Sequence, residues 1–332
     1  MAGRPALGID LGGTKVLAGV VDADNRVLAR AKRNTPAKEG AQAILAALVG
    51  AARDALTAAG VEPARLVGAG VGSPGPLDPD RGVILFSANL NVRDFALGPD
   101  LSRALGTPVL VRNDVRVGGY GEFRLGAARG RRSMLAAFVG TGIGGCVVVD
   151  GQIVVGATGN AGEIGHTILK AGGPRCGCGR LGCMEALASR TAIARRVRKA
   201  IRKGQATVLK GAVSDKDDRL KSRDLAAAVE AGDLVAVKEV RRAAHYLGLG
   251  LGGLINVLGP EIVVVGGGVA EALGNAYVDL VRDAARGQAL ADPAGTIPIV
   301  PADLGDDAGI LGAALFAREQ FGAAEDSTGN VA

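Results

Sequence analysis

The sequence contains no tryptophan, three tyrosines and six phenylalanines among its 332 residues. Hydrophobic residues nevertheless make up 48% of the chain, so the core must be built mainly from alanine, valine, leucine and isoleucine. This composition is typical of a globular protein and excludes a disordered or fibrous chain. The length is sufficient for two domains, each with a core of its own.

Two targeting features are also absent from the sequence. No signal peptide precedes the strand-like run that begins at Leu7, and no uncharged apolar stretch is long enough to cross a membrane. We therefore expect a cytoplasmic protein that has no membrane partner. A reducing compartment would also keep cysteine thiols available for a metal.

The net charge is +6 at pH 7, and much of the excess lies between Arg190 and Lys203. Surfaces that bind nucleic acid often combine basic residues with aromatic ones, and this segment has no aromatic residue. We interpret it as the solvated face of a helix and expect no nucleic-acid partner. Its basic residues include Arg195, Arg196, Arg198, Lys199, Arg202 and Lys203.

Three of the four cysteines and one of the two histidines lie within 18 residues of one another. Thiolate and imidazole ligands in this combination are typical of a structural zinc site, which holds the metal in a closed tetrahedron. The alternatives are free thiols, which rarely cluster in this way, and disulfides, which would leave one of the three cysteines unpaired. Cys146 lies apart, in an apolar run, and is interpreted as a core residue. The predicted zinc ligands are His166, Cys176, Cys178 and Cys183.

Residues 7–22 and 134–153 share one pattern, which is an apolar strand, a glycine-rich turn, a second apolar strand and an aspartate. A strand on each side of the turn predicts a β-hairpin. This excludes a Rossmann dinucleotide site, whose glycines open a helix, and the spacing excludes a Walker A loop. Backbone amides in such turns can face phosphate oxygens, and the repetition indicates a duplicated α/β domain. The predicted phosphate-facing residues are Gly12, Gly13, Thr14 and Lys15 in the first turn and Thr141, Gly142, Gly144 and Gly145 in the second.

Two carboxylates lie where predicted strands reach their ends. Asp10 is at the edge of the first hairpin, where it is placed to hold a hydrated Mg²⁺ against phosphate oxygens. Asp114 comes after Asn113 at the end of a short apolar strand over residues 108–111, and a carboxylate in this position is suited to act as a general base. A helix cap is the alternative interpretation of the Asn113-Asp114 pair.

Glycine-rich loops follow two further predicted strands. The loop 72–78 follows the strand 66–71, at the carboxyl end where open α/β sheets bind their ligands, and an ordinary turn is the alternative. The strand 262–265 is followed by a strand-to-helix turn that is suited to packing under a nucleotide. This second turn consists of Gly266, Gly267 and Gly268.

These motifs together resemble the ROK family of sugar kinases and related regulators, within the actin-like ATPase superfamily, over nearly the whole chain. The segments that carry the resemblance are residues 10–14, 74–76, 89–90, 113–114, 140–145, 162–166, 176–185 and 266–268. The resemblance implies two actin-like, ribonuclease H-like α/β domains around a central cleft, with a small zinc-bound loop. We expect an N-terminal domain over residues 1–115, completed by a helix over 306–321, a larger domain over 116–305 and a disordered tail over 322–332.

The resemblance also implies a role for each motif. Asp114 would take the proton from a sugar hydroxyl while that oxygen attacks the γ-phosphate of ATP, with Mg²⁺ and both glycine turns steadying the charge. Zinc would be structural, and the assembly a homodimer or homotetramer. The expected sugar-binding residues are Asn89, Asn113, Asp114, Glu163, His166 and Glu185. The chain departs from the common family pattern at Arg112, Arg116 and Val92, which bears on the choice of sugar.

The leading hypothesis is therefore an ATP-dependent hexokinase-type enzyme, with glucose as the substrate that the resemblance favours. Fructose, mannose, an N-acetylhexosamine and a polyphosphate donor are alternatives within the same class of enzyme. A sugar-sensing transcriptional regulator is an alternative from another class, but such regulators carry a DNA-binding segment ahead of the first glycine turn, and here that motif starts at Leu7. An inactive sugar-binding module would need the loss of a catalytic group, and Asp10 and Asp114 are both present.

Overall fold

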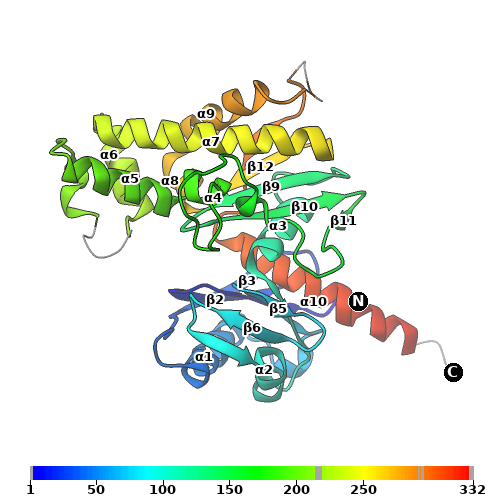
Figure 1. The fold of residues 1–332 in the computed structure, drawn as a ribbon. Helices are drawn as coiled ribbons and strands as arrows, with labels where there is room; N and C mark the ends of the chain where they lie inside the picture. Colours follow the sequence, from blue (N-terminus) through cyan, green and yellow to red (C-terminus); the bar gives the residue numbers. More distant parts are fainter. Residues whose placement is uncertain (1–2, 214–218, 291, 293–294, 329–332) are drawn as a thin grey trace. The chain divides into compact units, whose positions relative to one another are not determined.

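The computed structural model describes residues 3–213, 219–290, 292 and 295–328. It divides into two compact units, drawn in Figure 1. The first unit runs from the N-terminus to Gly126 and resumes at Asp306, and the second unit is Ala127–Gly305. Each unit combines a mixed β-sheet with helices, so the predicted α/β class is confirmed.

A five-stranded sheet with the order β3-β2-β1-β4-β8 forms the centre of the first unit. The first three of these strands are antiparallel neighbours, whereas β4 and β8 run parallel to β1. The strands are β1 (Ala6–Leu11), β2 (Lys15–Val21), β3 (Val27–Asn34), β4 (Ala69–Ser73) and β8 (Val109–Asn113). The helices of this unit are α1 (Ala41–Ala59), η1 (Pro63–Arg65), α2 (Leu97–Leu105), α3 (Asp114–Arg124) and α10 (Asp307–Thr328).

The second unit repeats this topology, with the strand order β11-β10-β9-β12-β13. The pair β9 and β10 corresponds to β1 and β2, and β12 and β13 again run parallel to the first strand of the hairpin. The duplication predicted from the two hairpins is therefore present in the sheets. The strands are β9 (Met134–Val139), β10 (Ile143–Val149), β11 (Gln152–Ile153), β12 (Val263–Gly266) and β13 (Ile299–Pro301).

Helices account for most of the remainder of the second unit. The longest, α7, packs along α9, as Figure 1 shows, and glycines of α7 face the backbone of α9. Its sequence begins with Asp233 as a capping residue, whose side chain accepts a hydrogen bond from the Ala236 amide, and it ends at Gly259. The helical segments are η2 (Ile164–His166), α4 (Met184–Ala188), α5 (Arg190–Arg202), η3 (Val208–Gly211), α6 (Ser222–Glu230), α7 (Leu234–Leu258), α8 (Gly268–Leu273) and α9 (Asn275–Arg286).

Helix α1 has its apolar residues at helical spacing, and it ends at Gly60, which has a φ of 64°. Among the described residues it is the one helix that is long and apolar enough to cross a membrane by length and composition. Its apolar residues instead contribute to the core of the first unit, so we interpret it as a core helix. Those buried residues are Ile44, Leu48, Ala51, Ala52, Ala55 and Leu56.

The C-terminal helix α10 lies directly on the first sheet because glycines remove the side chains between them. A Cβ atom added at Gly8 would lie 1.8 Å from the Ile310 carbonyl oxygen, and one added at Gly70 would lie 2.0 Å from the Ala313 carbonyl oxygen. Such contacts leave no room for any larger residue. They explain why the chain from Asp306 onward belongs to the first unit.

Two predicted boundaries differ from the structure. The first segment of the first unit ends at Gly126 and not at residue 115, so helix α3 belongs to this unit. The reason is that α3 packs closely on α10, where a Cβ atom at Gly312 would lie 1.9 Å from the Val117 oxygen of α3. The tail predicted to be disordered from residue 322 instead continues α10 to Thr328. Residues 329–332 lie outside the described residues.

The first unit contains a second sheet and a helix that were not predicted from the sequence. Strands β5 (Leu77–Asp78), β6 (Val83–Ser87) and β7 (Val92–Phe95) form a three-stranded sheet, and α2 was not predicted. Helices α4 and α5 are separated at Ser189, whose extended backbone ends α4. The Ser189 hydroxyl caps α5 by accepting a hydrogen bond from the Ala192 amide.

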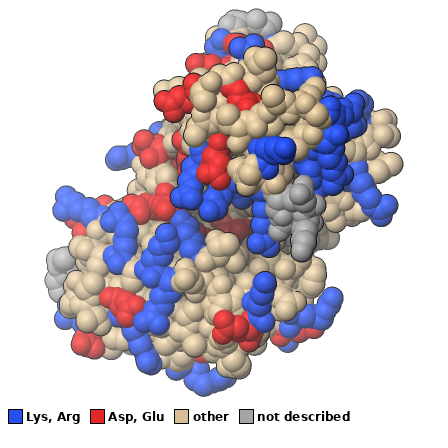
Figure 2. Space-filling model, turned by 90° about the vertical axis from the view of Figure 1, so that its left-hand side faces the viewer, with Lys and Arg blue, Asp and Glu red and all other residues tan. Residues whose placement is uncertain are grey.

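The interpretation of the basic segment as a solvated face is wrong for Arg196. The side chain of Arg196 is 13% exposed and pairs with Glu239 of α7 at 2.5 Å. Burial of a guanidinium is tolerated here because a carboxylate compensates its charge. Figure 2 shows that, on the face that it draws, Lys and Arg side chains are interspersed with Asp and Glu.

Two glycines of α7 provide a test of how closely this helix packs. A Cβ atom at Gly248 would lie 2.5 Å from the Ala284 Cβ atom, whereas Gly253 is exposed with no atom within 4 Å of the added position. We expect Gly248→Ala to lower the free energy of unfolding by about 1–3 kcal/mol through overpacking. The matched change Gly253→Ala should raise it by up to about 1 kcal/mol, since alanine is the better helix former. Urea denaturation of both variants measures this, and equal effects would contradict the α7–α9 packing.

Candidate active site and metal centre

The four predicted zinc ligands converge in the second unit. One ligand atom from each of His166, Cys176, Cys178 and Cys183 lies within 4.8 Å of the other three. The Cys176 sulfur is 3.8 Å from the histidine Nδ1 atom, and the Cys178 and Cys183 sulfurs are 3.7 Å apart. No disulfide links the four cysteines, which are all free thiols.

This geometry fits zinc. Four ligand atoms bonded to one zinc ion at about 2.0–2.3 Å in a tetrahedron stand roughly 3.3–3.8 Å apart. The Cys178–Cys183 sulfur separation of 3.7 Å and the Cys176–His166 separation of 3.8 Å fall at the upper end of that range, and all four ligand atoms lie within 4.8 Å of one another. Three sulfurs and one imidazole nitrogen also match the ligand types that zinc prefers, so the residues present fit a closed, structural metal site.

The thiols differ in their affinity for protons. Burial raises the pKa of Cys176 to about 12 and also raises the pKa of Cys183. The exposed Cys178 has its pKa lowered to about 7, mainly by a hydrogen bond from the Arg180 backbone. A metal binds thiolates, so its binding must displace the protons of the two buried thiols, and affinity for the metal should fall as the pH is lowered.

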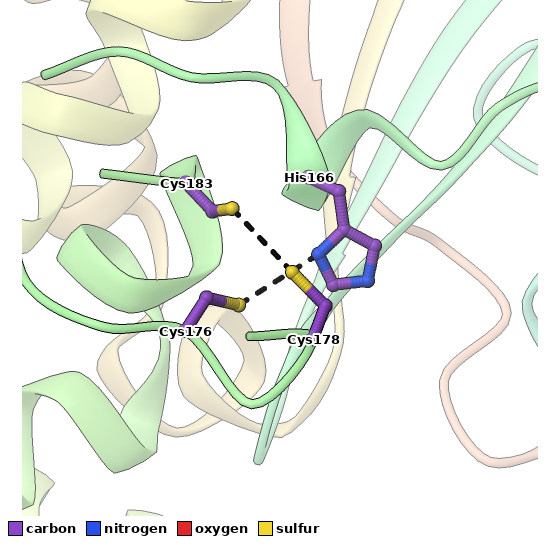
Figure 3. A group of neighbouring side chains, drawn as sticks. All are labelled: His166, Cys176, Cys178 and Cys183. Atoms are coloured by element: carbon purple, nitrogen blue, oxygen red, sulfur yellow. Dashed lines mark hydrogen bonds between the residues drawn. The ribbon is translucent and has the colours of Figure 1, made fainter. Parts of the chain in front are cut away.

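His166 points the Nδ1 edge of its imidazole ring toward the three cysteine sulfurs. Figure 3 shows that the Nδ1 atom points to the three sulfurs and that the other ring nitrogen lies on the far side of the ring. A histidine that uses one nitrogen for a metal keeps the second for a hydrogen bond, and the metal then fixes the orientation of the ring. His166 is therefore available to orient a polar ligand on that far side.

The segment that carries Glu163 and His166 lies directly on strand β10. A Cβ atom at Gly165 would lie 2.1 Å from the Ile143 oxygen, and one at Gly145 would lie 2.6 Å from the Gly162 oxygen. Gly162 also has a φ of 89°, which favours glycine. The glycines beside Glu163 and His166 thus bring the backbone of this segment against β10, next to the second glycine turn.

Glu185 connects the metal centre with that turn. One of its carboxylate oxygens accepts a hydrogen bond from the Ile143 amide at 3.0 Å, and the other lies 3.4 Å from the Cys176 sulfur. A Cβ atom at Gly142 would lie 2.3 Å from the same carboxylate, so a larger residue there would displace the carboxylate from this position. The position of the Glu185 carboxylate therefore depends both on the second glycine turn and on the metal loop, the segment 176–183 that carries the three cysteines.

The second glycine turn has backbone groups that remain available for a ligand. Within the described part of the chain, no protein group accepts a hydrogen bond from the amides of Thr141 and Gly142. Gly144 and Gly145 continue the turn into β10. The other side of the site is the turn between β12 and α8, where Gly267 has a φ of 83° and would meet the Val139 backbone if it had a side chain. Gly266 and Gly268 flank it at the end of β12 and the start of α8.

The first glycine turn lies in the first unit and has a different electrostatic environment. The Gly12 amide donates a hydrogen bond to the Lys15 oxygen, which closes the turn around Gly13 and Thr14. The Lys15 ammonium forms an ion pair with Asp306 at 2.6 Å. Asn89 also lies beside the first glycine turn, because a Cβ atom at Gly13 would lie 3.4 Å from the Asn89 Cβ atom.

Asp10 lies behind this turn and is poorly solvated. Burial raises its pKa to about 6, the charge of Lys15 opposes this shift, and the charge of Asp306 adds to it. Two carboxylates near one another beside a solvent-accessible glycine turn are the oxygen ligands that Mg²⁺ prefers. The site therefore offers Asp10 with Asp306 as candidate ligands, directly or through water.

Asn113 and Asp114 lie at the junction of β8 and α3. The Asn113 side chain caps α3 by accepting a hydrogen bond from the Arg116 amide at 3.1 Å, so the capping interpretation holds for the asparagine. Asp114 is the first residue of α3, and its carboxylate accepts a hydrogen bond from the Val115 amide at 2.9 Å. A helix N-terminus favours the ionised carboxylate that a general base requires.

Two residues of these sites were missed by the sequence analysis. Asp306 follows the last strand, and the only indication was its place at the carboxyl end of that strand. Arg190 was assigned to a solvated helix face, but its guanidinium is half-buried and bonds to the Thr141 hydroxyl at 2.7 Å. Neither pairing is visible locally, since both partners are distant in sequence.

Replacement of one metal ligand tests the metal centre. We expect Cys178→Ser to lower both the zinc content and the melting temperature of the purified protein, because the binding energy of a structural metal is part of the folding energy. Cys146→Ala is the matched control, since Cys146 lies on β10 outside the cluster, and it should keep a full complement of zinc. Elemental analysis and calorimetry measure both, and a zinc-replete Cys178→Ser variant would contradict the ligand set.

The buried carboxylate of Asp10 makes a second prediction. Its folded-state pKa of about 6 exceeds the reference value of 3.8, so ionisation destabilises the folded protein as the pH rises through this range. We expect Asp10→Asn to unfold less readily than the wild type near neutral pH, by on the order of 2 kcal/mol, with the difference shrinking as the pH falls from about 6 to about 4. The exposed Asp24→Asn serves as the control. Denaturation curves across this range measure it, and an effect that is independent of pH would contradict the buried charge.

Comparison with known proteins identifies the relatives of this chain. A model of the ROK family matches residues 6–320. The chain is 33% identical over 321 residues to a glucokinase of Halalkalibacterium halodurans, which covers 96% of this chain and 97% of that protein. It is 39% identical to the ROK hexokinase from Thermus thermophilus, with a TM-score of 0.79 and coverage of 96% and 99%. It is 32% identical to a ROK family glucokinase from Streptomyces griseus, solved in complex with glucose and AMPPNP, with a TM-score of 0.81 and coverage of 95% and 99%. The chain therefore belongs to the ROK family.

Proposed function

We propose that this protein is an ATP-dependent sugar kinase that transfers the γ-phosphate of ATP to a hydroxyl of glucose and forms glucose 6-phosphate. The observation that carries the proposal is the framework in the second unit, where Glu163, His166 and Glu185 are fixed beside a glycine turn with free amides. The similarity to glucokinases over nearly the full length of the chain supports the same function.

Asp114 acts as the general base in this proposal. Its carboxylate accepts the proton of the sugar hydroxyl as the hydroxyl oxygen attacks the γ-phosphorus, the bond to the β,γ-bridging oxygen breaks, and ADP leaves with that oxygen. Phosphoryl transfer depends mainly on positioning and on stabilising charge, so the amides of the two glycine turns are the groups expected to contact phosphate. Lys15 adds a positive charge at the first turn.

The same proposal includes residues for binding the metal ions and the sugar. Asp10, with Asp306, would hold Mg²⁺, which supplies charge neutralisation when it accompanies the nucleotide. Zinc at the four-ligand centre would be structural. The turn at Gly266, Gly267 and Gly268 would support the nucleotide. The residues proposed to bind hydroxyls of the sugar are Asn89, Asn113, Asp114, Glu163, His166 and Glu185.

The choice among related functions depends on measurements with substrates. Fructose, mannose and N-acetylhexosamines remain alternative acceptors, and a polyphosphate is an alternative donor. A sugar-sensing regulator is less favoured, because the groups needed for transfer are present and the glucokinase relative is matched over 97% of its length. We further propose a cytoplasmic location, since a site built from three cysteines needs reduced thiols, and a homodimer or homotetramer, which light scattering distinguishes from a monomer.

Conversion of the proposed base to its amide tests the function directly. We expect Asp114→Asn to lower glucose-dependent ADP release from Mg-ATP by about 10²- to 10⁴-fold, because an amide cannot accept the proton. Glucose affinity should change little, since the amide still forms hydrogen bonds. The assay couples ADP release to oxidation of NADH, and calorimetry measures glucose binding.

The exposed Asp24→Asn is again the control and should retain full turnover. Near-normal turnover in Asp114→Asn would remove Asp114 from its role and leave the kinase function standing. Failure of the wild-type protein to release ADP with any hexose would contradict the proposed function itself.

A further inference from the structure

Among the residues that the structure describes, Arg190 is a half-buried cation without an acidic partner. Its guanidinium donates hydrogen bonds to the Thr141 hydroxyl at 2.7 Å and to the Ser222 hydroxyl at 3.0 Å. Burial alone lowers the pKa of this guanidinium, and in the part of the chain that the structure describes no carboxylate pairs with it. An uncompensated charge removed from water is costly, and such groups are frequent at binding sites.

Arg196 of the same helix shows the usual solution to this cost. Its guanidinium is more deeply buried than that of Arg190, and it forms an ion pair with Glu239 at 2.5 Å as well as a hydrogen bond to the Leu187 oxygen. At Arg196 a carboxylate compensates the buried charge. Among the described residues, Arg190 has two hydroxyls as partners instead, and these leave its positive charge uncompensated.

The surroundings of Arg190 are those of an anion site. The residue is the first of α5, a helix of 13 residues with no acidic residue in its first turn, and its backbone amide donates to the Gly140 oxygen of the glycine turn. The neighbouring Thr191 hydroxyl donates to the Thr141 oxygen at 2.7 Å. The guanidinium, the positive end of the helix and the free amides of Thr141 and Gly142 therefore lie together.

We propose that Arg190 binds a phosphate group of ATP at the second glycine turn, an inference that rests on the proposed kinase function. The planar guanidinium is suited to phosphate oxygens, and bonds of this charge-assisted kind are among the strongest that proteins form. The phosphate supplies a negative charge beside the Arg190 guanidinium, whose described partners are neutral hydroxyls. Thr141 and Ser222 hold the guanidinium in place before the nucleotide arrives.

Binding of nucleotides to Arg190→Gln tests this role. We expect the affinity for Mg-AMPPNP, measured by calorimetry, to fall by about 10- to 100-fold, the range for a hydrogen bond between charged groups. The affinity for adenosine, measured by competition with AMPPNP, should stay within about two-fold, because adenosine has no phosphate. Affinity for AMPPNP in the wild type should also weaken with added salt more steeply than in the variant.

Two further variants separate charge from structure. Arg190→Lys keeps the charge without the planar geometry, and it should retain the salt dependence and recover part of the affinity. Arg202→Gln removes an exposed charge at the other end of the same helix and should bind AMPPNP like the wild type. Melting temperatures show whether each variant is folded.

The outcomes distinguish this inference from the function on which it rests. If the wild type binds Mg-AMPPNP and Arg190→Gln binds it equally well, or loses adenosine and AMPPNP affinity in equal proportion, the assignment of Arg190 is overturned and the kinase function stands. If the wild type does not bind Mg-AMPPNP, the nucleotide site itself is wrong.

Discussion

The functional part of this protein depends on a backbone contact that only glycines allow. Gly165 places the chain against the Ile143 oxygen, and Gly145 faces the Gly162 oxygen from the other side. Because no side chain separates these segments, Glu163 and His166 are held directly beside the second glycine turn. A single methyl group at either contact would push apart the segment that carries the two polar side chains and the strand that carries the turn.

The metal loop adds a second restraint at the same place. His166 is both a candidate ligand of the metal centre and a neighbour of β10, while Glu185 accepts a hydrogen bond from the Ile143 amide and lies beside Cys176. A loop rich in glycine has high conformational entropy when it is free, so a bound metal would remove much of that freedom before any substrate arrives. The metal centre, the polar side chains and the turn therefore form one connected framework, which explains why these residues are so close in the sequence.

The two units share one topology, but the charged residues around their glycine turns differ. Both sheets place a glycine hairpin beside parallel strands, but the first unit surrounds its turn with Asp10, Lys15 and Asp306. The second unit surrounds its turn with the cation Arg190 and with the segments that carry Glu163 and Glu185. The first environment suits a cation together with phosphate, and the second suits phosphate together with a polar substrate.

Local pattern was sufficient to predict much of this arrangement. The hairpins, the buried strands and helix α1 follow from hydrophobic spacing and turn residues, and the metal ligands follow from the clustering of cysteines. The three-stranded sheet β5-β6-β7 was missed because none of its strands is fully buried and two of them, β5 and β7, contain charged residues. The pairing of Lys15 with Asp306 spans 291 positions, and that of Arg190 with Thr141 spans 49. Contacts of this kind are set by the packing of whole elements, so one sequence carries no local trace of them.

The dependence of glucose affinity on bound zinc tests the central claim that the metal centre organises the polar side chains. Calorimetry would compare the zinc-loaded protein with protein stripped by a chelator under conditions where circular dichroism shows that it remains folded. The account predicts that glucose affinity is lost on removal of zinc and returns when zinc is restored, because Glu163, His166 and Glu185 lose their common restraint. Equal glucose affinity with and without zinc would contradict it.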